Sequence, residues 1–189
     1  MKITIFIQYL SILIWLLPPI RQYKSQYFIF FLILAAFDPI LYSAYLSFGI
    51  HTLQFYPIMT FLLIISLSNN KKQFLWVAIS LVILILSYVY KNDTEILYCL
   101  CIILYSIVLY QIFIKLIEMI IQERLLNLFL SLLIFYALIN ELKFIAIVLD
   151  LYTGAISYYL ATFTQIFFGI IFSFITISTK NYPLSSKLS

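Results

Sequence analysis

Seven apolar stretches, separated by short polar breaks, run through the whole of this 189-residue chain. Hydrophobic residues make up 65% of the sequence and charged residues only 10%, whereas soluble domains average about 45–50% apolar and 25% charged residues. In lipid, a backbone segment has to pair its polar groups internally, and an apolar run of this kind does so as a helix. The sequence therefore predicts an all-α fold, a polytopic membrane bundle of seven transmembrane helices.

The expected helices follow the apolar stretches. In order they cover about 3–17, 27–48, 52–68, 74–90, 96–114, 124–139 and 152–178. The fifth is expected to continue past the membrane surface through Lys115, Glu118 and Glu123. Pro18 and Pro19 are expected to end the first helix, because proline interrupts the hydrogen-bond ladder. The stretch 140–150 carries three charges and is predicted to be an interfacial connection rather than a membrane core. Residues 1–179 then form a single domain, and 180–189 form a polar cytoplasmic tail.

The lysines and arginines predict the orientation of these helices. With the N-terminus outside, Lys2, Lys91 and Lys143 lie outside, and the other eight of the eleven basic residues lie inside. Basic residues are retained on the cytoplasmic side, so an N-out, C-in arrangement is expected. No small-x-small cleavage site precedes Pro18, so the first helix is expected to be retained. Topology accounts for the net charge of +4, and no nucleic-acid partner is expected.

Asp38 and Pro39 stand in the middle of the second apolar stretch. At the centre of a bilayer an Asp costs about 2.5–3.5 kcal/mol, so Asp38 is expected to face protein, water or a ligand. Two compatible interpretations are open. In the structural one, Asp38 caps the second of two half-helices that begin at Pro39. In the functional one, the carboxylate binds a proton, a cation or an amine inside a cavity.

Two further groups of polar residues are candidates for the same site. On the last helix, five residues recur at intervals of four and form an inclined ridge: Ser157, Ala161, Gln165, Gly169 and Ser173. Such a ridge is typical of a helix-packing seam, and Gln165 is the member that could instead line a pocket with Asp38. Gln111 shares a helix face with Lys115, which suits either solvated pairing at an interface or a ligand. The predicted ligand-binding residues are Asp38, Gln165, Gln111, Ser157 and Thr162.

Motifs for catalysis are scarce. His51 is the single histidine, and there is no glycine-rich phosphate loop. Cys99 and Cys101 lie two residues apart, which turns their side chains about 200° from each other on a helix, so they are interpreted as packing residues. No enzymatic activity, metal or cofactor is expected.

Three local features carry a resemblance to a known family: Leu17 to Ile20 (LPPI) closing the first helix, Asp38 within the second, and Thr153 to Tyr159 (TGAISYY) opening a Phe-rich last helix. With the helix order, they resemble a family of small seven-helix membrane domains of Bacteroidetes-type bacteria, found alone or ahead of sensor kinases. The resemblance covers most of the chain and implies a sensory role, although that family has no established ligand. It often has Phe-Trp before the last helix, where this sequence has Leu151 and Tyr152, and no kinase segment is expected to follow.

Three functions are compatible with these observations. The first is a sensor-like domain in which a ligand or partner helix shifts the packing around Asp38, with the signal passed to a partner membrane or signalling protein. The second is a small-solute transporter with a mid-membrane site at Asp38. Leu17 to Arg21 (LPPIR) resembles the PQ-loop sugar transporters, but it lacks the Gln and has no second copy. The third is a structural subunit of a membrane complex.

Overall fold

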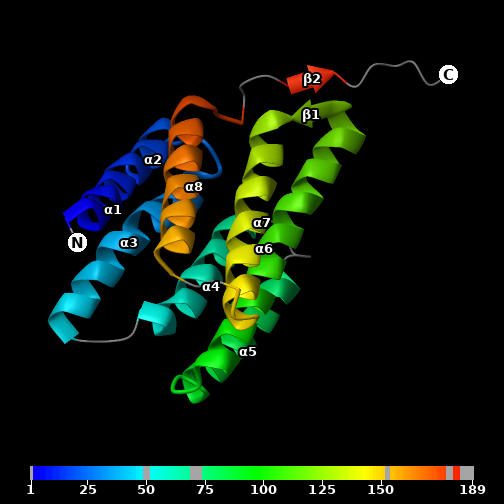
Figure 1. Cartoon of the computed structure of the whole chain (residues 1–189). Coiled ribbons are helices and arrows are strands. Elements are labelled where there is room, and N and C mark those ends of the chain that lie inside the picture. Colours follow the sequence, from blue (N-terminus) through cyan, green and yellow to red (C-terminus); the bar gives the residue numbers. More distant parts are fainter. Residues whose placement is uncertain (1, 49–51, 69–73, 152–153, 178–180, 184–189) are drawn as a thin grey trace.

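The computed structural model describes residues 2–48, 52–68, 74–151, 154–177 and 181–183 (Figure 1). Its elements, in chain order, are α1 (Lys2–Trp15), α2 (Leu17–Arg21), α3 (Phe28–Phe48), the 3-10 helix η1 (Thr52–Phe55), α4 (Tyr56–Leu67), α5 (Phe74–Val89), α6 (Thr94–Glu123), β1 (Leu125–Asn127), α7 (Leu128–Val148), α8 (Gly154–Phe174) and β2 (Asn181–Pro183). The predicted helical bundle is confirmed. The one addition among the described residues is a short antiparallel ribbon in which Leu126 lies opposite Tyr182.

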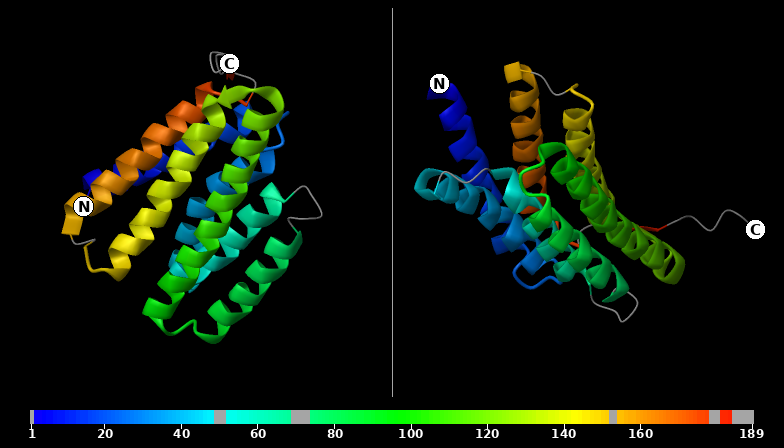
Figure 2. Two further views of the ribbon diagram at one scale, coloured as in Figure 1. Left: turned by 90° about the vertical axis from the view of Figure 1, so that its right-hand side faces the viewer. Right: turned by 90° about the horizontal axis from the view of Figure 1, so that it is seen from below.

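The helices form two groups that meet along a seam. One group contains α1, α2, α3 and α8, in which α3 and α8 both pack against α1 and α2 (Figure 1). The other group contains α4, α5, α6 and α7, in which α6 packs against α7 and α4. Figure 2 shows α7 and α8 side by side across the seam, and α3 also contacts α4. We call the end of the bundle that carries β1 and β2 the ribbon end.

Two of the described helices are long and apolar enough to cross a membrane, namely Thr94–Gln122 within α6 and Leu128–Val148, which is α7. Shorter apolar helices cover Phe6–Arg21, Phe28–Ala44, Leu53–Leu67, Phe74–Val89 and Tyr159–Phe174. These helices follow the seven apolar stretches of the sequence in order.

Three predicted boundaries are wrong. The first helix ends at Trp15, and Pro18 and Pro19 fall in the first turn of α2, where a missing N–H does no harm. The stretch 140–150 is helical as far as Val148, because its charged side chains find neighbours inside the bundle, as described below. Arg124 does not start a helix but ends α6 in the left-handed conformation, with φ of 51°.

Part of the predicted polar tail is described by the structure. Residues 181–183 pair as β2 with the strand β1 that separates α6 from α7. The other residues of the tail, and Gly49 and His51, lie outside the described residues.

Seven aromatic residues join the two groups of helices. We call them the aromatic layer: Trp15, Tyr27, Phe31, Phe129, Tyr136, Phe168 and Phe172. Ring centroids lie 5.0 Å apart between Phe31 and Phe172 and 5.2 Å apart between Tyr27 and Phe129. Aromatic pairs at such distances contribute about 0.5–1.5 kcal/mol beyond the area they bury. The layer therefore holds α3 and α8 against α7.

Gly169 marks the closest approach of α8 to α1. A Cβ atom at this position would lie 2.8 Å from Ile14 Cγ2 and 3.4 Å from Trp15 Nε1. The small-residue ridge on the last helix is thus a packing seam at Gly169, as the spacing suggested. At Gln165, one turn earlier, the same ridge faces a cavity.

We expect Gly169→Ala to lower the free energy of unfolding by about 1 kcal/mol. Overpacking costs about 1–3 kcal/mol, and the better helix propensity of alanine returns up to about 1 kcal/mol. Denaturant unfolding of the purified protein measures the change. In an Ile14→Ala background the clash is gone, so the same Gly169→Ala change should become stabilising. A loss of equal size in both backgrounds would show that Ile14 is not the obstacle.

Candidate functional site

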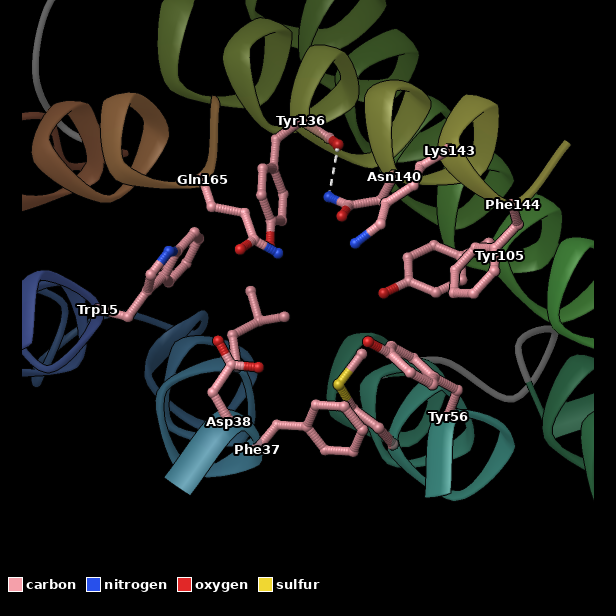
Figure 3. Close-up of a pocket in the computed structure, with 12 residues that line it drawn as sticks. Trp15, Phe37, Asp38, Tyr56, Tyr105, Tyr136, Asn140, Lys143, Phe144 and Gln165 are labelled. Atoms are coloured by element: carbon pink, nitrogen blue, oxygen red, sulfur yellow. Dashed lines mark hydrogen bonds between the residues drawn. The ribbon is translucent and has the colours of Figure 1, made fainter. Parts of the chain in front are cut away.

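A cavity of about 30 Å³ lies at the seam between the two groups of helices (Figure 3). Its lining comes from six helices: Trp15, Leu34, Phe37, Asp38, Tyr56, Met59, Tyr105, Tyr136, Asn140, Lys143, Phe144 and Gln165. A volume of this size holds about two water molecules. We call it the Asp38 cavity.

Asp38 reaches this cavity from an unbroken helix. The expected half-helices, with Asp38 as the cap of the second, are not found, because α3 continues from Phe28 to Phe48 with Pro39 inside it. Proline within a helix removes one backbone hydrogen bond, and neighbouring helices on a well-packed seam can support such a defect. The capping interpretation of Asp38 is therefore wrong, and the carboxylate points into the cavity (Figure 3).

Asp38 and Lys143 face the cavity from opposite sides, on α3 and α7. Within the described part of the chain, no hydrogen bond and no ion pair within 4 Å engages the Asp38 carboxylate. Opposite charges attract strongly in a poorly polarisable interior. The two groups nevertheless lie too far apart to form an ion pair, so the cavity separates a carboxylate from an ammonium group.

Hydroxyl and amide groups complete the polar wall. Figure 3 shows the phenol groups of Tyr56 and Tyr105 and the amide of Gln165 directed towards the centre. The Asn140 side chain is fixed by its own helix, since Nδ2 donates to the Tyr136 carbonyl at 2.9 Å. A molecule in the cavity would thus meet hydrogen-bond donors and acceptors, together with one acidic and one basic side chain.

The cavity is closed towards the ribbon end. Phe31, Phe129 and Phe172 each lie seven residues, about two helical turns, from a cavity residue of the same helix, on its ribbon side. All three side chains are 0% exposed. The aromatic layer therefore forms a floor under the Asp38 cavity.

A second cavity adjoins the first. It has a volume of about 300 Å³, lies between α7 and α8, and is lined mainly by apolar side chains. Four residues line both cavities: Tyr136, Asn140, Lys143 and Gln165. We call it the α7–α8 cleft. The polar cavity and the apolar cleft are therefore neighbouring compartments with a shared polar wall.

The structure brings together two of the five predicted ligand residues. Asp38 and Gln165 line the same cavity, as the position of Gln165 on the helical ridge predicts. Thr162 is buried on α8 but lines neither cavity. Ser157 belongs to α8, and its side chain lies outside the described residues.

Gln111 belongs to a different part of the bundle. It is buried on α6, and its Nε2 donates to Ser68 Oγ at 3.1 Å, while its Oε1 has no hydrogen-bond partner in the described structure. Lys115, one turn further on, places its Nζ 5.4 Å from the centre of the Tyr27 ring. These contacts lock α6 to its neighbours, so Gln111 is not part of the Asp38 cavity.

The contribution of α7 to the cavity is not predicted from the sequence. The charges in 140–150 predict a connection that separates Asn140 and Lys143 from Tyr136, whereas the spacing of four and three residues places all three on one helix face. That spacing is the signal in the sequence that indicates this wall of the cavity. Glu141, on the same helix, is engaged separately, because the Ser106 hydroxyl of α6 donates to Glu141 Oε1. No group of three or more His, Cys, Asp or Glu side chains that could hold a metal ion occurs among the described residues.

Comparison with known proteins gives no assignment: no protein-family model, no curated protein and no solved structure matches the chain.

Proposed function

We propose that this chain is a seven-helix, multi-pass protein of the bacterial inner membrane, N-out and C-in, that senses a ligand in the Asp38 cavity and signals through a partner protein. The observation that carries the proposal is the convergence of six helices on one charged cavity. A guest that touches all of them alters how the two groups of helices pack, which is what a sensor requires.

The membrane part of the proposal rests on helix length and charge. Helices α3, α7 and α8 have 21 residues each, about 31 Å at 1.5 Å per residue, close to the thickness of a bilayer core. Helices α4 and α5 are shorter, with 12 and 16 residues, a mismatch that local thinning of the bilayer can absorb. With Lys143 inside α7, the predicted count of basic residues becomes eight inside against two outside.

Sensing is favoured over transport for two reasons. The transport hypothesis depended on a broken helix at Asp38, and α3 is continuous. A substrate path would also have to pass the floor formed by Phe31, Phe129 and Phe172, each fully buried. These rings would have to move for a substrate to cross, and α3 has no break at Asp38 about which its two halves could move.

Photo-crosslinking in living cells tests the proposal. A photoreactive residue at Ile121, which is 72% exposed near the ribbon end of α6, should give a discrete protein adduct whose yield changes in Asp38→Asn. The matched control is Glu141→Gln, since Glu141 also exchanges acid for amide but lines neither cavity. An adduct that is equally strong in wild type and Asp38→Asn would overturn sensing and indicate a structural subunit. The lack of any adduct would also overturn sensing through a partner protein.

A further inference from the structure

The α7–α8 cleft opens on the side of the bundle. Leu142 and Leu160 line it and are 51% and 64% exposed, so they form the lip of the opening. Ile139, Ala146 and Ala161 continue the apolar lining inwards. In the proposed membrane arrangement this lip faces hydrocarbon, and the natural occupant of the cleft is a lipid chain.

Lys143 lies where the two cavities meet, because it lines both. Its ammonium group is a compact positive charge that suits a phosphate at the junction. Beyond Lys143 lies the Asp38 carboxylate, with no hydrogen bond or ion pair from the described residues. From the lip inwards, the site therefore presents apolar side chains, then the positive charge of Lys143, then the negative charge of Asp38.

An aminophospholipid presents the complementary order: acyl chain, phosphate, ammonium. An ammonium group is about the size of a water molecule, and the Asp38 cavity, with about 30 Å³, has room for about two waters. An ammonium group donates three hydrogen bonds, for which Asp38 and Gln165 provide acceptors. A trimethylammonium group donates none and fills more space, and a glycerol headgroup carries no positive charge.

We propose that the Asp38 cavity and the α7–α8 cleft form one binding site for an aminophospholipid of the phosphatidylethanolamine class, which enters between α7 and α8. The ammonium group lies at Asp38, the phosphate at Lys143, and one acyl chain in the cleft. This assignment rests on the proposed function, because it names the ligand of the same cavity.

Native mass spectrometry of the full chain, released from detergent, tests the assignment. The protein is mixed with equal amounts of phosphatidylethanolamine, phosphatidylcholine and phosphatidylglycerol with identical acyl chains. Wild type should retain one phosphatidylethanolamine with a preference of about tenfold over each of the other lipids, the factor that one charge-assisted contact provides. Equal retention of the three lipids would overturn the assignment.

Three variants locate the site. Asp38→Asn should remove the preference for phosphatidylethanolamine, and Glu141→Gln should keep it. Ala161→Phe fills the cleft without altering a charge, so it should lower retention of the lipid even if Asp38→Asn does not fold. Full lipid preference in both Asp38→Asn and Ala161→Phe would place the bound lipid elsewhere and overturn the assignment.

The two proposals fail separately. If the three lipids bind equally but Asp38→Asn still changes the crosslink at Ile121, the aminophospholipid assignment is wrong and sensing stands. If phosphatidylethanolamine is preferred but the crosslink is indifferent to Asp38, the lipid site stands and sensing is wrong.

Discussion

Lys143→Met is expected to destabilise the protein by up to about 3 kcal/mol, the lower end of the loss when one partner of a buried charge pair is removed. Lys143 and Asp38 face the same cavity. Without Lys143, no cation lies across the cavity from Asp38, so this half-buried carboxyl group either stays charged at a cost or takes up a proton. The effect falls at the lower end because no ion pair within 4 Å joins the two groups in the described structure.

A double-mutant cycle isolates this interaction. Asp38→Asn combined with Lys143→Met removes both charges, so the double variant should be more stable than the sum of the two single losses implies. Unfolding in detergent with increasing denaturant gives the four free energies. Lys24→Met removes an exposed charge and should change stability by less than about 0.5 kcal/mol. Strictly additive losses would show that Asp38 and Lys143 do not interact.

Asn127→Ala should lower the free energy of unfolding by about 2–4 kcal/mol. Asn127 is 0% exposed and makes two hydrogen bonds through one amide. Its Oδ1 accepts from the Leu130 N–H at 3.0 Å and caps α7, and its Nδ2 donates to the Ile177 carbonyl at 2.8 Å. Loss of a helix cap costs about 1 kcal/mol, and leaving the partly buried Ile177 carbonyl without its donor costs about 1–3 kcal/mol more.

Two variants separate these contributions. Asn127→Ser keeps a capping oxygen but is too short to reach Ile177, so it should recover about 1 kcal/mol of the loss. Asp93→Ala removes a cap of the same kind from an exposed position, where Asp93 Oδ1 accepts from the Ile96 N–H at 3.1 Å, and should cost only about 1 kcal/mol. The thermal midpoint and the denaturant midpoint both report the order of the three variants. If Asn127→Ala cost no more than Asp93→Ala, the contact with Ile177 would contribute nothing.

The sequence was sufficient for the helices and for Asp38, and insufficient for the wall opposite Asp38. Apolar runs and polar breaks predict where helices form, because the pattern is local. Lys143 was assigned to a connection because charge density in a short window indicates exposure, and the pattern contains no information on tertiary partners. Glu141 accepts a hydrogen bond from the Ser106 hydroxyl. Lys143 faces the Asp38 cavity. Both contacts arise only when α7 packs against other helices.

Asn127 and Gln22 illustrate a second limit. The Gln22 Nε2 donates to the Ile175 carbonyl at 2.8 Å, and the Asn127 Nδ2 donates to the Ile177 carbonyl, so two amides from distant parts of the chain hold the segment that follows α8. Backbone carbonyls outside a helix or strand need such side-chain donors. Nothing in the local sequence of either amide indicates the partner, because the contacts span 153 and 50 residues.

The floor of the Asp38 cavity restricts how a bound molecule can leave. Phe31, Phe129 and Phe172 are all fully buried, and their rings close the ribbon side of the cavity. A molecule held at Asp38 therefore has no direct way out past these three rings. Arrival and departure have to share the remaining side of the bundle, so whatever blocks that side after binding also traps the bound molecule.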